Sequence, residues 1–234
     1  MISFFDTIFH MKEIIRRHLN LKYLIPFVAY ELILFICTFI ALIFFLDNVN
    51  YAITDLVSTL VMLLFIVFFF RKEFKENQLK FNKETVKIII RYTVILFSLN
   101  IITSFIESIL SGLLNVSLET TNQGMLMEMF YDNFICISVS AVLAGITEEM
   151  LYRYSIFRLF KNRKLAFIMS WLIFAFGHFS GFNLASYISM IGYLVLSFVL
   201  TYIYYKYDDI RIVCGVHVLN NTLGVIEILI LLFL

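Results

Sequence analysis

Long apolar stretches dominate this chain and set the strongest limit on its fold. Residues 24–46 form one such stretch, in which Glu31 is the only charged side chain. A bilayer core is about 30 Å thick, so a helix needs about 20 mostly apolar residues to cross it. The chain is 62% hydrophobic and 15% charged, whereas soluble domains are roughly 45–50% apolar and about 25% charged. The sequence therefore predicts an all-α integral membrane protein.

Seven segments have the apolar character of membrane spans. The third contains polar side chains that we expect to face other helices, Ser98, Asn100, Ser104 and Glu107. Because the fourth is long enough to be split or tilted, any number from six to eight spans fits the pattern. We predict a polytopic helical bundle, one integral membrane domain over residues 1–234, with spans at residues 24–46, 56–70, 86–114, 130–160, 165–179, 184–205 and 212–234.

Basic residues fall only at alternate ends of these segments. All 18 Lys and Arg residues lie before the first span, between the second and third, from Arg153 to Lys164 at the end of the fourth, or between the sixth and seventh. Loops that stay in the cytoplasm collect Lys and Arg. We therefore expect a multi-pass protein of the cell membrane with a cytoplasmic N-terminus and an extracellular C-terminus. The net charge of +1 gives no sign of a nucleic-acid partner.

The first 23 residues alternate basic and apolar side chains at near-helical spacing. This pattern is typical of a basic amphipathic helix on a membrane surface, although a solvated leader fits it too. His10 and His18 belong to this segment and are expected at the surface. A cleaved signal peptide fits less well, because the apolar stretch that follows is much longer than the apolar region of such a peptide.

Two adjacent carboxylates and an arginine interrupt the fourth apolar segment. A charged side chain near a bilayer centre costs at least about 2.5 kcal/mol, so an intramembrane cluster of this kind indicates a functional site. Glu149 and Arg153 are four residues apart and would form an ion pair on one helix face. Glu148 is rotated by about 100° from Glu149 and is free to face a cavity as a general base. A salt bridge that only fixes helix packing is the structural alternative.

Two further polar groups lie in later apolar segments. His178 is predicted deep in the fifth segment, next to Gly177, where a neighbouring backbone can approach closely. His217 and Asn221 are one helical turn apart in the seventh segment and share a face. Each group alone is equally typical of a polar contact between helices. Together with the glutamates they would form one pocket if the three helices are neighbours.

A carboxylate, two histidines and an amide can activate water and stabilise the oxyanion of a cleaved carbonyl. Glu148, His178 and His217 are also candidate zinc ligands, although they do not form a zinc-protease HExxH motif. The pattern leaves metal-bound water and carboxylate-activated water equally open. Cys37, Cys136 and Cys214 lie inside apolar segments without metal-ligand spacing and are interpreted as buried hydrophobic residues.

The three groups in this order resemble the motifs of the CPBP intramembrane proteases, which include CAAX prenyl proteases and bacteriocin-processing enzymes and are also called the Abi family. The family pattern is EExxxR, then FxxxH, then HxxxN. Here it reads Glu148-Glu149-Met-Leu-Tyr-Arg153, Phe174-Ala-Phe-Gly-His178 and His217-Val-Leu-Asn-Asn221. The resemblance covers the motif region at about residues 141–224.

The resemblance implies an intramembrane endopeptidase whose site opens toward the cytosol. Glu148 would activate the water, Glu149 and Arg153 would support it, and the remaining motif residues, His178, His217 and Asn221, would stabilise the oxyanion. The richness in Lys, Asn, Ile and Phe is typical of a low-GC Gram-positive bacterium. The expected substrate is therefore a membrane-associated peptide or protein without a prenyl group. The alternative is a non-catalytic immunity or scaffold protein, or a proton-coupled carrier that uses Glu148 as its relay.

Overall fold

The computed structural model describes residues 18–45, 50–76, 81–118 and 122–233, and within them the secondary structure is helical apart from one isolated bridge between Leu19 and Phe160. The prediction of an all-α bundle is confirmed. Most of the N-terminal segment predicted to be amphipathic lies outside the described residues. The long helices are α2 (Ile25–Phe45), α3 (Tyr51–Phe69), α5 (Lys83–Leu114), α7 (Phe134–Glu149), α9 (Arg163–Gly177), α10 (Leu184–Tyr207) and α11 (Ile210–Phe233).

Shorter elements connect or extend these helices. The helix α7 continues through a π-helical stretch, η3 (Met150–Ser155), into α8 (Ile156–Leu159), so the predicted fourth span is one long rod with a change of pitch. Its start is later than predicted, because residues at the beginning of that segment belong to α6. The other short elements are η1 (Leu21–Leu24), α4 (Arg71–Glu76) and α6 (Asn122–Asp132).

Asparagine side chains set the beginnings of most of the long helices. In each case the side-chain oxygen accepts a backbone N–H of the first turn, which satisfies a group that has no partner inside the helix. The distance to the Thr85 amide at the start of α5 is 2.8 Å, for example. With a single proline in the chain, asparagine is the main helix-start signal. The capping residues are Asn50, Asn82, Asn133, Asn162 and Asn183.

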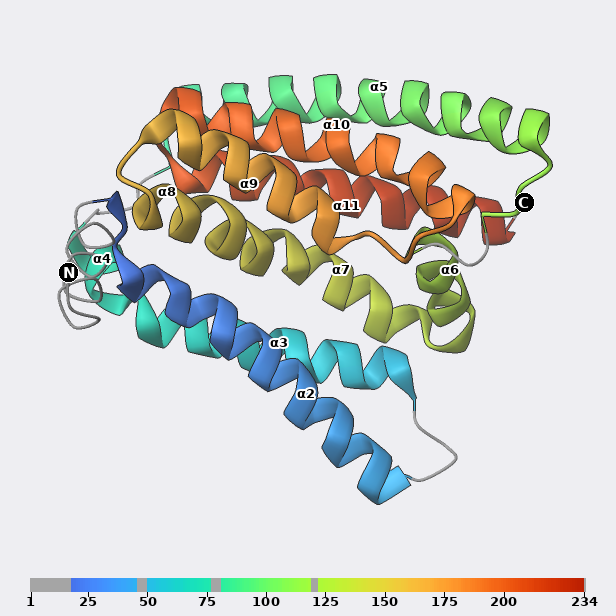
Figure 1. Ribbon diagram of the computed structural model, residues 1–234, viewed down its shortest axis with the longest axis horizontal. Coiled ribbons are helices and arrows are strands. Elements are labelled where there is room, and N and C mark those ends of the chain that lie inside the picture. The colour runs from blue at the N-terminus through green and yellow to red at the C-terminus, as the bar shows by residue number, and fades with distance from the viewer. Residues whose placement is uncertain (1–17, 46–49, 77–80, 119–121, 234) are drawn as a thin grey trace, which may run out of the picture.

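Six helical segments in the described part of the chain are long and apolar enough to cross a membrane. The predicted fifth span is the exception, since α9 has 15 residues and extends for only about 22 Å at 1.5 Å per residue. It ends inside the bundle, and the connection to α10 covers the remaining distance to the far end (Figure 1). The chain therefore still reverses direction from each long helix to the next. The six candidate membrane spans of the described chain lie within the predicted range of six to eight.

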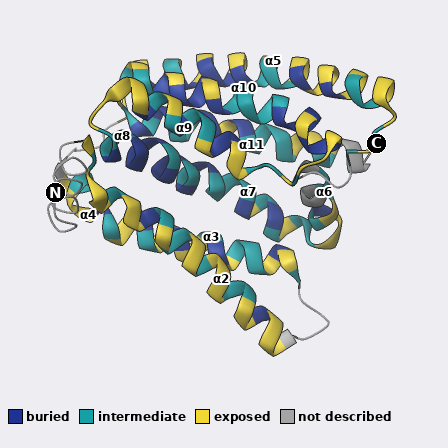
Figure 2. Cartoon of the chain, viewed as in Figure 1, coloured by how far each residue is buried: buried dark blue, intermediate teal, exposed yellow. Residues whose placement is uncertain are grey.

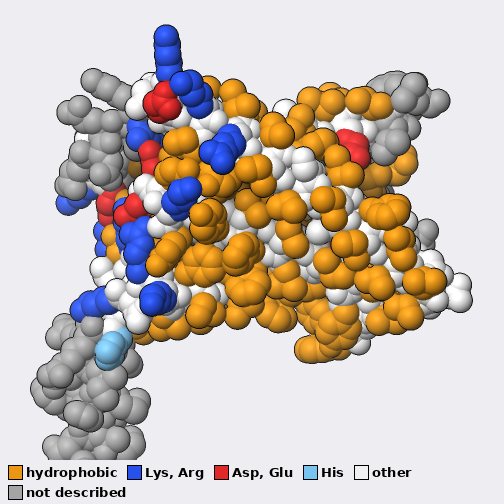
Figure 3. Space-filling view, turned by 90° about the horizontal axis from the view of Figure 1, so that it is seen from above, with side chains coloured by type: hydrophobic (Ala, Val, Ile, Leu, Met, Phe, Trp, Pro, Cys, Tyr) orange, Lys and Arg blue, Asp and Glu red, His pale blue; other side chains and the backbone are white. Residues whose placement is uncertain are grey.

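The described Lys and Arg side chains gather at one end of the bundle, and an apolar surface covers most of the remaining length (Figure 3). This is the end where α2 begins and where α4 and α8 lie, whereas α11 ends at the opposite end (Figure 1). Lys22 pairs there with Glu73 at 2.7 Å, and this hydrogen bond holds the pKa of Glu73 below its usual value. The basic connections predicted from the sequence thus lie together at one end of the bundle. Which side of the membrane that end faces stays a prediction.

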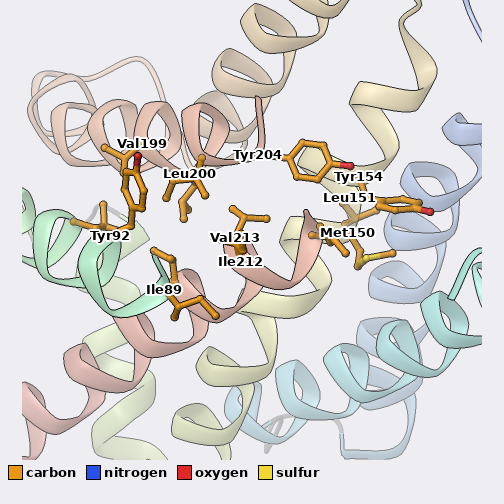
Figure 4. Close-up of a cluster of buried hydrophobic side chains, with 14 of the residues drawn as sticks. Ile89, Tyr92, Met150, Leu151, Tyr154, Val199, Leu200, Tyr204, Ile212 and Val213 are labelled. Carbon is orange, nitrogen blue, oxygen red and sulfur yellow. The ribbon is translucent and has the colours of Figure 1, made fainter. Parts of the chain in front are cut away.

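The buried core lies where α5, α10 and α11 meet η3. Leu151, Leu200 and Val213 are completely buried there and belong to one cluster to which three elements contribute (Figure 4). In contrast, α2 is mostly exposed along its length (Figure 2), with Phe35 and Phe44 among its exposed side chains. A lipid-facing α2 explains this exposure, because lipid is as apolar as these side chains.

A glycine allows α7 and α11 to approach closely beside the polar groups. A Cβ at Gly145 would lie 2.9 Å from the backbone nitrogen of Val218, next to His217. We expect Gly145→Ala to lower the free energy of unfolding by about 1–3 kcal/mol, the usual effect of overpacking. Thermal unfolding in detergent measures it. Gly112→Ala is the control, because its Cβ meets nothing within 4 Å; equal unfolding temperatures for the two variants would contradict the close contact.

Candidate active site

A cavity of about 870 Å³ lies inside the bundle and is lined by residues of α2, α3, α5, α6, α7, η3, α9, α10 and α11. Glu148, His178, His217 and Asn221 are among its lining residues. Four of the predicted site residues, drawn from α7, α9 and α11, therefore face one space. The other two, Glu149 and Arg153, are completely buried behind it.

Glu149 is the centre of a buried polar group. Its Oε1 atom accepts from Arg153 Nη1 at 2.8 Å and lies 2.7 Å from His217 Nδ1. Both members of the ion pair have side chains that are 0% exposed, as the spacing of four residues led us to expect. A buried ion pair needs further hydrogen bonds to offset the loss of hydration. His217 supplies one of them, which couples α11 directly to α7.

Arg153 makes its other contacts with α10 and α9. Its Nη2 atom lies 3.2 Å from the backbone oxygen of Ser197 and 3.3 Å from the hydroxyl of the same residue. The guanidinium carbon lies 4.3 Å from the centre of the Phe174 ring, a cation–π contact. Ser197 in turn donates to the backbone oxygen of Trp171 at 2.7 Å. Arg153 thus connects the rod formed by α7 and η3 to α9 and α10 around Glu149. Ser197 takes part in this network, a role that the sequence did not predict.

Glu148 faces the cavity and two histidine rings. Its Oε2 lies 3.7 Å from Nε2 of His217, and its Oε1 lies 4.0 Å from Nε2 of His178. These separations are longer than hydrogen bonds. The Glu148 side chain is 22% exposed, in contrast to the complete burial of Glu149. The two adjacent glutamates therefore have different surroundings, one fixed by protein and the other open to the cavity.

The hydrogen bonds of the histidines determine which ring nitrogen is left for the cavity. His178 Nδ1 lies 2.9 Å from the backbone oxygen of Phe174. A carbonyl oxygen only accepts, so this Nδ1 is a donor, and the same reasoning holds for His217 Nδ1 against the Glu149 carboxylate. In a neutral ring the lone pair is then on Nε2. Both histidines thus present a hydrogen-bond acceptor toward Glu148.

The position of His178 differs from the prediction. The sequence placed it deep in an apolar helix, but it is the residue at which α9 ends, with its backbone N–H bonded to the carbonyl oxygen of Ala175. Beyond His178 the chain continues to Asn183, whose side chain caps the start of α10. The His178 ring stacks on Tyr193 of α10, with centres 4.5 Å apart. A stacked ring at a helix end has a fixed orientation that a residue within a lipid-facing helix would lack.

Asn221 lines the cavity but is also used to join helices. Its side-chain nitrogen donates to the backbone oxygen of Ala141 in α7 at 2.8 Å. The neighbouring Asn220 accepts from Asn100 of α5 at 2.8 Å. The pair holds α11 between α5 and α7, and one N–H of the Asn221 amide stays available for other partners.

The three predicted metal ligands, Glu148, His178 and His217, line one cavity. Two ligands of one tetrahedral zinc ion lie about 3.3 Å apart, given metal–ligand distances near 2.0–2.1 Å. Nε2 of His217 and of His178 lie 3.7 and 4.0 Å from the oxygens of Glu148. In the described part of the chain, no three His, Cys, Asp or Glu side chains group closely enough to hold a metal ion. The three side chains would have to move closer to one another to bind one zinc ion.

Two cavity-lining carboxylates that the sequence did not assign to a site join helices. Glu107 of α5 is only 6% exposed and accepts from the backbone N–H of Gly192 at 2.7 Å. Asp55 of α3 accepts a hydrogen bond from Ser140 of α7. Among the polar residues of the third segment, Asn100 and Glu107 do contact other helices as expected, but Ser98 bonds to its own helix at Val94. An acidic residue inside an apolar run was the available signal for Glu107, whereas Asp55 directly precedes the predicted second span.

The comparisons with known proteins concern mainly this part of the chain. Residues 128–223 match the family model of the Rce1-like type II CAAX prenyl endopeptidases. The chain is 35% identical over 140 residues to UPF0177 protein YvdC of Lactococcus lactis subsp. lactis (strain IL1403), covering 58% of this chain and 51% of that protein. UPF0177 protein YaiF of the same strain is 36% identical over 141 residues, covering 55% and 61%.

The alignments thus span about half to three fifths of the length of these two relatives. No solved structure gives a significant match. The matched residues 128–223 include all three motifs. The resemblance to the CPBP intramembrane protease family is therefore confirmed, with the Rce1-like match covering the region that forms the cavity around Glu148.

Proposed function

We propose that this chain is an intramembrane endopeptidase that hydrolyses a peptide bond of a membrane-associated peptide or protein, with Glu148 as the base that activates the water. The observation that carries the proposal is the convergence of Glu148 with Nε2 of His178 and His217 in one cavity between membrane-spanning helices. The Rce1-like family match supports proteolysis. The basic end of the bundle would face the cytoplasm.

The acceptors around Glu148 suit the binding of a single water molecule. A water that donates one hydrogen to Glu148 and the other to Nε2 of His178 or His217 directs its oxygen lone pairs away from all three groups. It is then oriented to attack a carbonyl carbon that enters from the cavity. Glu148 has the proximity and the unshared oxygens to take the proton, which are the requirements for a general base.

The reaction would follow in two balanced steps. The water oxygen bonds to the carbonyl carbon while one water proton passes to Glu148, which gives a tetrahedral oxyanion. The carbon–nitrogen bond then breaks, and Glu148 returns the proton to the leaving nitrogen, leaving a carboxyl terminus and an amine. Glu149 and Arg153 hold His217 in place behind the reacting groups through the bonds described above.

Terminal labelling of cell membranes tests the function whatever the substrate is. Cells that express the full chain or its Glu148→Gln variant at equal levels are compared by mass spectrometry of newly formed protein and peptide termini. We expect a set of termini that depends on Glu148. Identical sets would contradict proteolysis and would favour the non-catalytic scaffold or the carrier.

We expect the activity to be independent of a bound metal, because the candidate ligands do not form a metal-binding set in this arrangement. Purified chain in lipid vesicles should keep its cleavage rate after prolonged dialysis against a zinc chelator. Elemental analysis of the same preparation should find zinc far below one atom per chain. Loss of activity that returns on adding zinc, and not on adding magnesium, would establish the metal-dependent version instead.

A further inference from the structure

The proposed site offers few free donors for the oxyanion, one of which is the remaining N–H of Asn221. Stabilisation of a tetrahedral intermediate requires hydrogen-bond donors aimed at the developing negative charge. His178 and His217 each use their Nδ1 donor on protein partners, so their neutral rings present acceptors to the cavity. Asn221 uses one of its two N–H groups on Ala141. A further donor close to Glu148 would complete the site.

Tyr152 is placed where such a donor is needed. Tyr152 is four residues after Glu148, and Arg153 is four residues after Glu149. The Glu148–Tyr152 pair and the Glu149–Arg153 pair therefore lie on adjacent faces of the helical rod formed by α7 and η3. Arg153 is completely buried with its glutamate, whereas Tyr152 lines the cavity together with Glu148. The spacing that buries one pair therefore brings the other pair to the cavity.

The ring of Tyr152 is fixed from several sides. It makes edge contacts with Phe27 of α2 and Phe174 of α9, at centre distances of 5.8 and 5.1 Å. The backbone oxygen of Tyr152 accepts from the Ser170 hydroxyl at 2.6 Å, which ties η3 to α9. Such contacts leave the phenol little freedom, and a preorganised donor loses little entropy when it binds the oxyanion.

The hydroxyl of Tyr152 reaches the end of α9. A Cβ at Gly177 would lie 3.2 Å from this oxygen, so the absence of a side chain at Gly177 makes room for it beside His178. The sequence led us to expect a neighbouring backbone at this glycine, and a side-chain hydroxyl lies there instead. Tyr152 is partly buried, and within the described chain its hydroxyl has no hydrogen-bond partner.

Three other hydroxyls of the cavity wall are less suited. Thr147 and Ser189 donate to backbone oxygens of their own helices, Ala144 and Ser186. Tyr30 also lines the cavity, but it comes from α2, the most exposed of the long helices, and it does not share a helical face with Glu148. We infer that the Tyr152 hydroxyl donates a hydrogen bond to the substrate carbonyl oxygen and to the oxyanion that forms from it. This inference rests on the proposed peptidase function.

Tyr152→Phe tests the inference because it removes the hydroxyl and keeps the ring that Phe27 and Phe174 hold. The probe is an internally quenched peptide that spans a Glu148-dependent cleavage site found by terminal labelling, presented in lipid vesicles. We expect kcat to fall roughly 10²-fold, the effect of losing one oxyanion donor, while KM changes little. Tyr154→Phe is the matched control, because Tyr154 is in the same π-helical stretch but packs against Phe70 in the core.

A second substitution separates the hydroxyl from ring packing. Gly177→Ala should lower kcat several-fold when Tyr152 is present, because the new Cβ displaces the Tyr152 hydroxyl by a few tenths of an ångström. In the Tyr152→Phe background it should have no further effect. The inference is overturned if Tyr152→Phe keeps kcat within twofold while Glu148→Gln is inactive, or if Tyr30→Phe causes the loss instead. If the unaltered chain and the Glu148→Gln variant cleave the peptide at the same rate, both the proposed peptidase function and the inference about Tyr152 are contradicted.

Discussion

Glu148→Gln is expected to reduce peptide cleavage by about 10⁴-fold, the upper end of the range for general acid–base catalysis, because one carboxylate would serve in both steps. The amide keeps the shape of the side chain but cannot accept a proton from water. Glu148 makes no hydrogen bond of normal length among the described residues and is 22% exposed, so the substitution leaves packing intact. Cleavage of the quenched peptide by purified protein in vesicles measures the loss, and the unfolding temperature should stay unchanged.

The control for this variant is Glu84→Gln, which makes the same chemical change outside the cavity. Glu84 is 73% exposed and, among the described residues, pairs with Lys87 on its own helix. Its activity should equal that of the unaltered chain. A Glu148→Gln protein that retains a tenth or more of the activity would remove Glu148 from the role of base, whatever the result for Glu149.

Arg153→Met is expected to cause the largest loss of stability, about 3–5 kcal/mol of the free energy of unfolding, because it leaves the Glu149 carboxylate buried without its cation. The methionine also loses the hydrogen bonds to Ser197. Thermal unfolding in detergent, or the yield of folded protein after extraction, measures the effect. Adding Glu149→Gln should recover part of the loss, since the buried charge is then gone.

Lys87→Met provides the comparison for a surface ion pair. Lys87 and Glu84 are both more than two thirds exposed, and such pairs contribute about 0–1 kcal/mol. Unfolding temperatures that fall equally for Lys87→Met and Arg153→Met would show that Arg153 is not holding a buried charge. Failure of Glu149→Gln to improve Arg153→Met would lead to the same conclusion.

The sequence was sufficient to predict the bundle because spanning a bilayer permits few alternatives. Backbone groups in lipid must be satisfied within the segment, so long apolar runs form helices. The predicted span at residues 165–179 was less accurate. Its apolar residues form the shorter helix α9, and apolar composition alone does not show whether a helix contacts lipid or ends inside a bundle.

The site was predictable to the extent that helical spacing determines it. The four-residue interval between Glu149 and Arg153 predicted their ion pair, and the adjacent position of Glu148 predicted a different face. The bond between Glu149 and His217 depends on how closely α7 and α11 pack, which Gly145 permits. The spacing of residues along one chain does not contain that information. For the same reason Ser197 had no signal that separated it from other residues of its helix. The spacing of Tyr152 from Glu148 did not show that the Tyr152 hydroxyl lies beside Gly177 of α9.

Isotope labelling of the products tests the central claim most directly. Purified chain in vesicles is mixed with the quenched peptide in water enriched in ¹⁸O, and both product fragments are weighed by mass spectrometry. If Glu148 activates a water for peptide-bond hydrolysis, the fragment with the new carboxyl terminus gains one ¹⁸O atom at a rate that Glu148→Gln abolishes. Absence of labelled fragments from the full chain, or equal labelling with Glu148→Gln, would contradict the account.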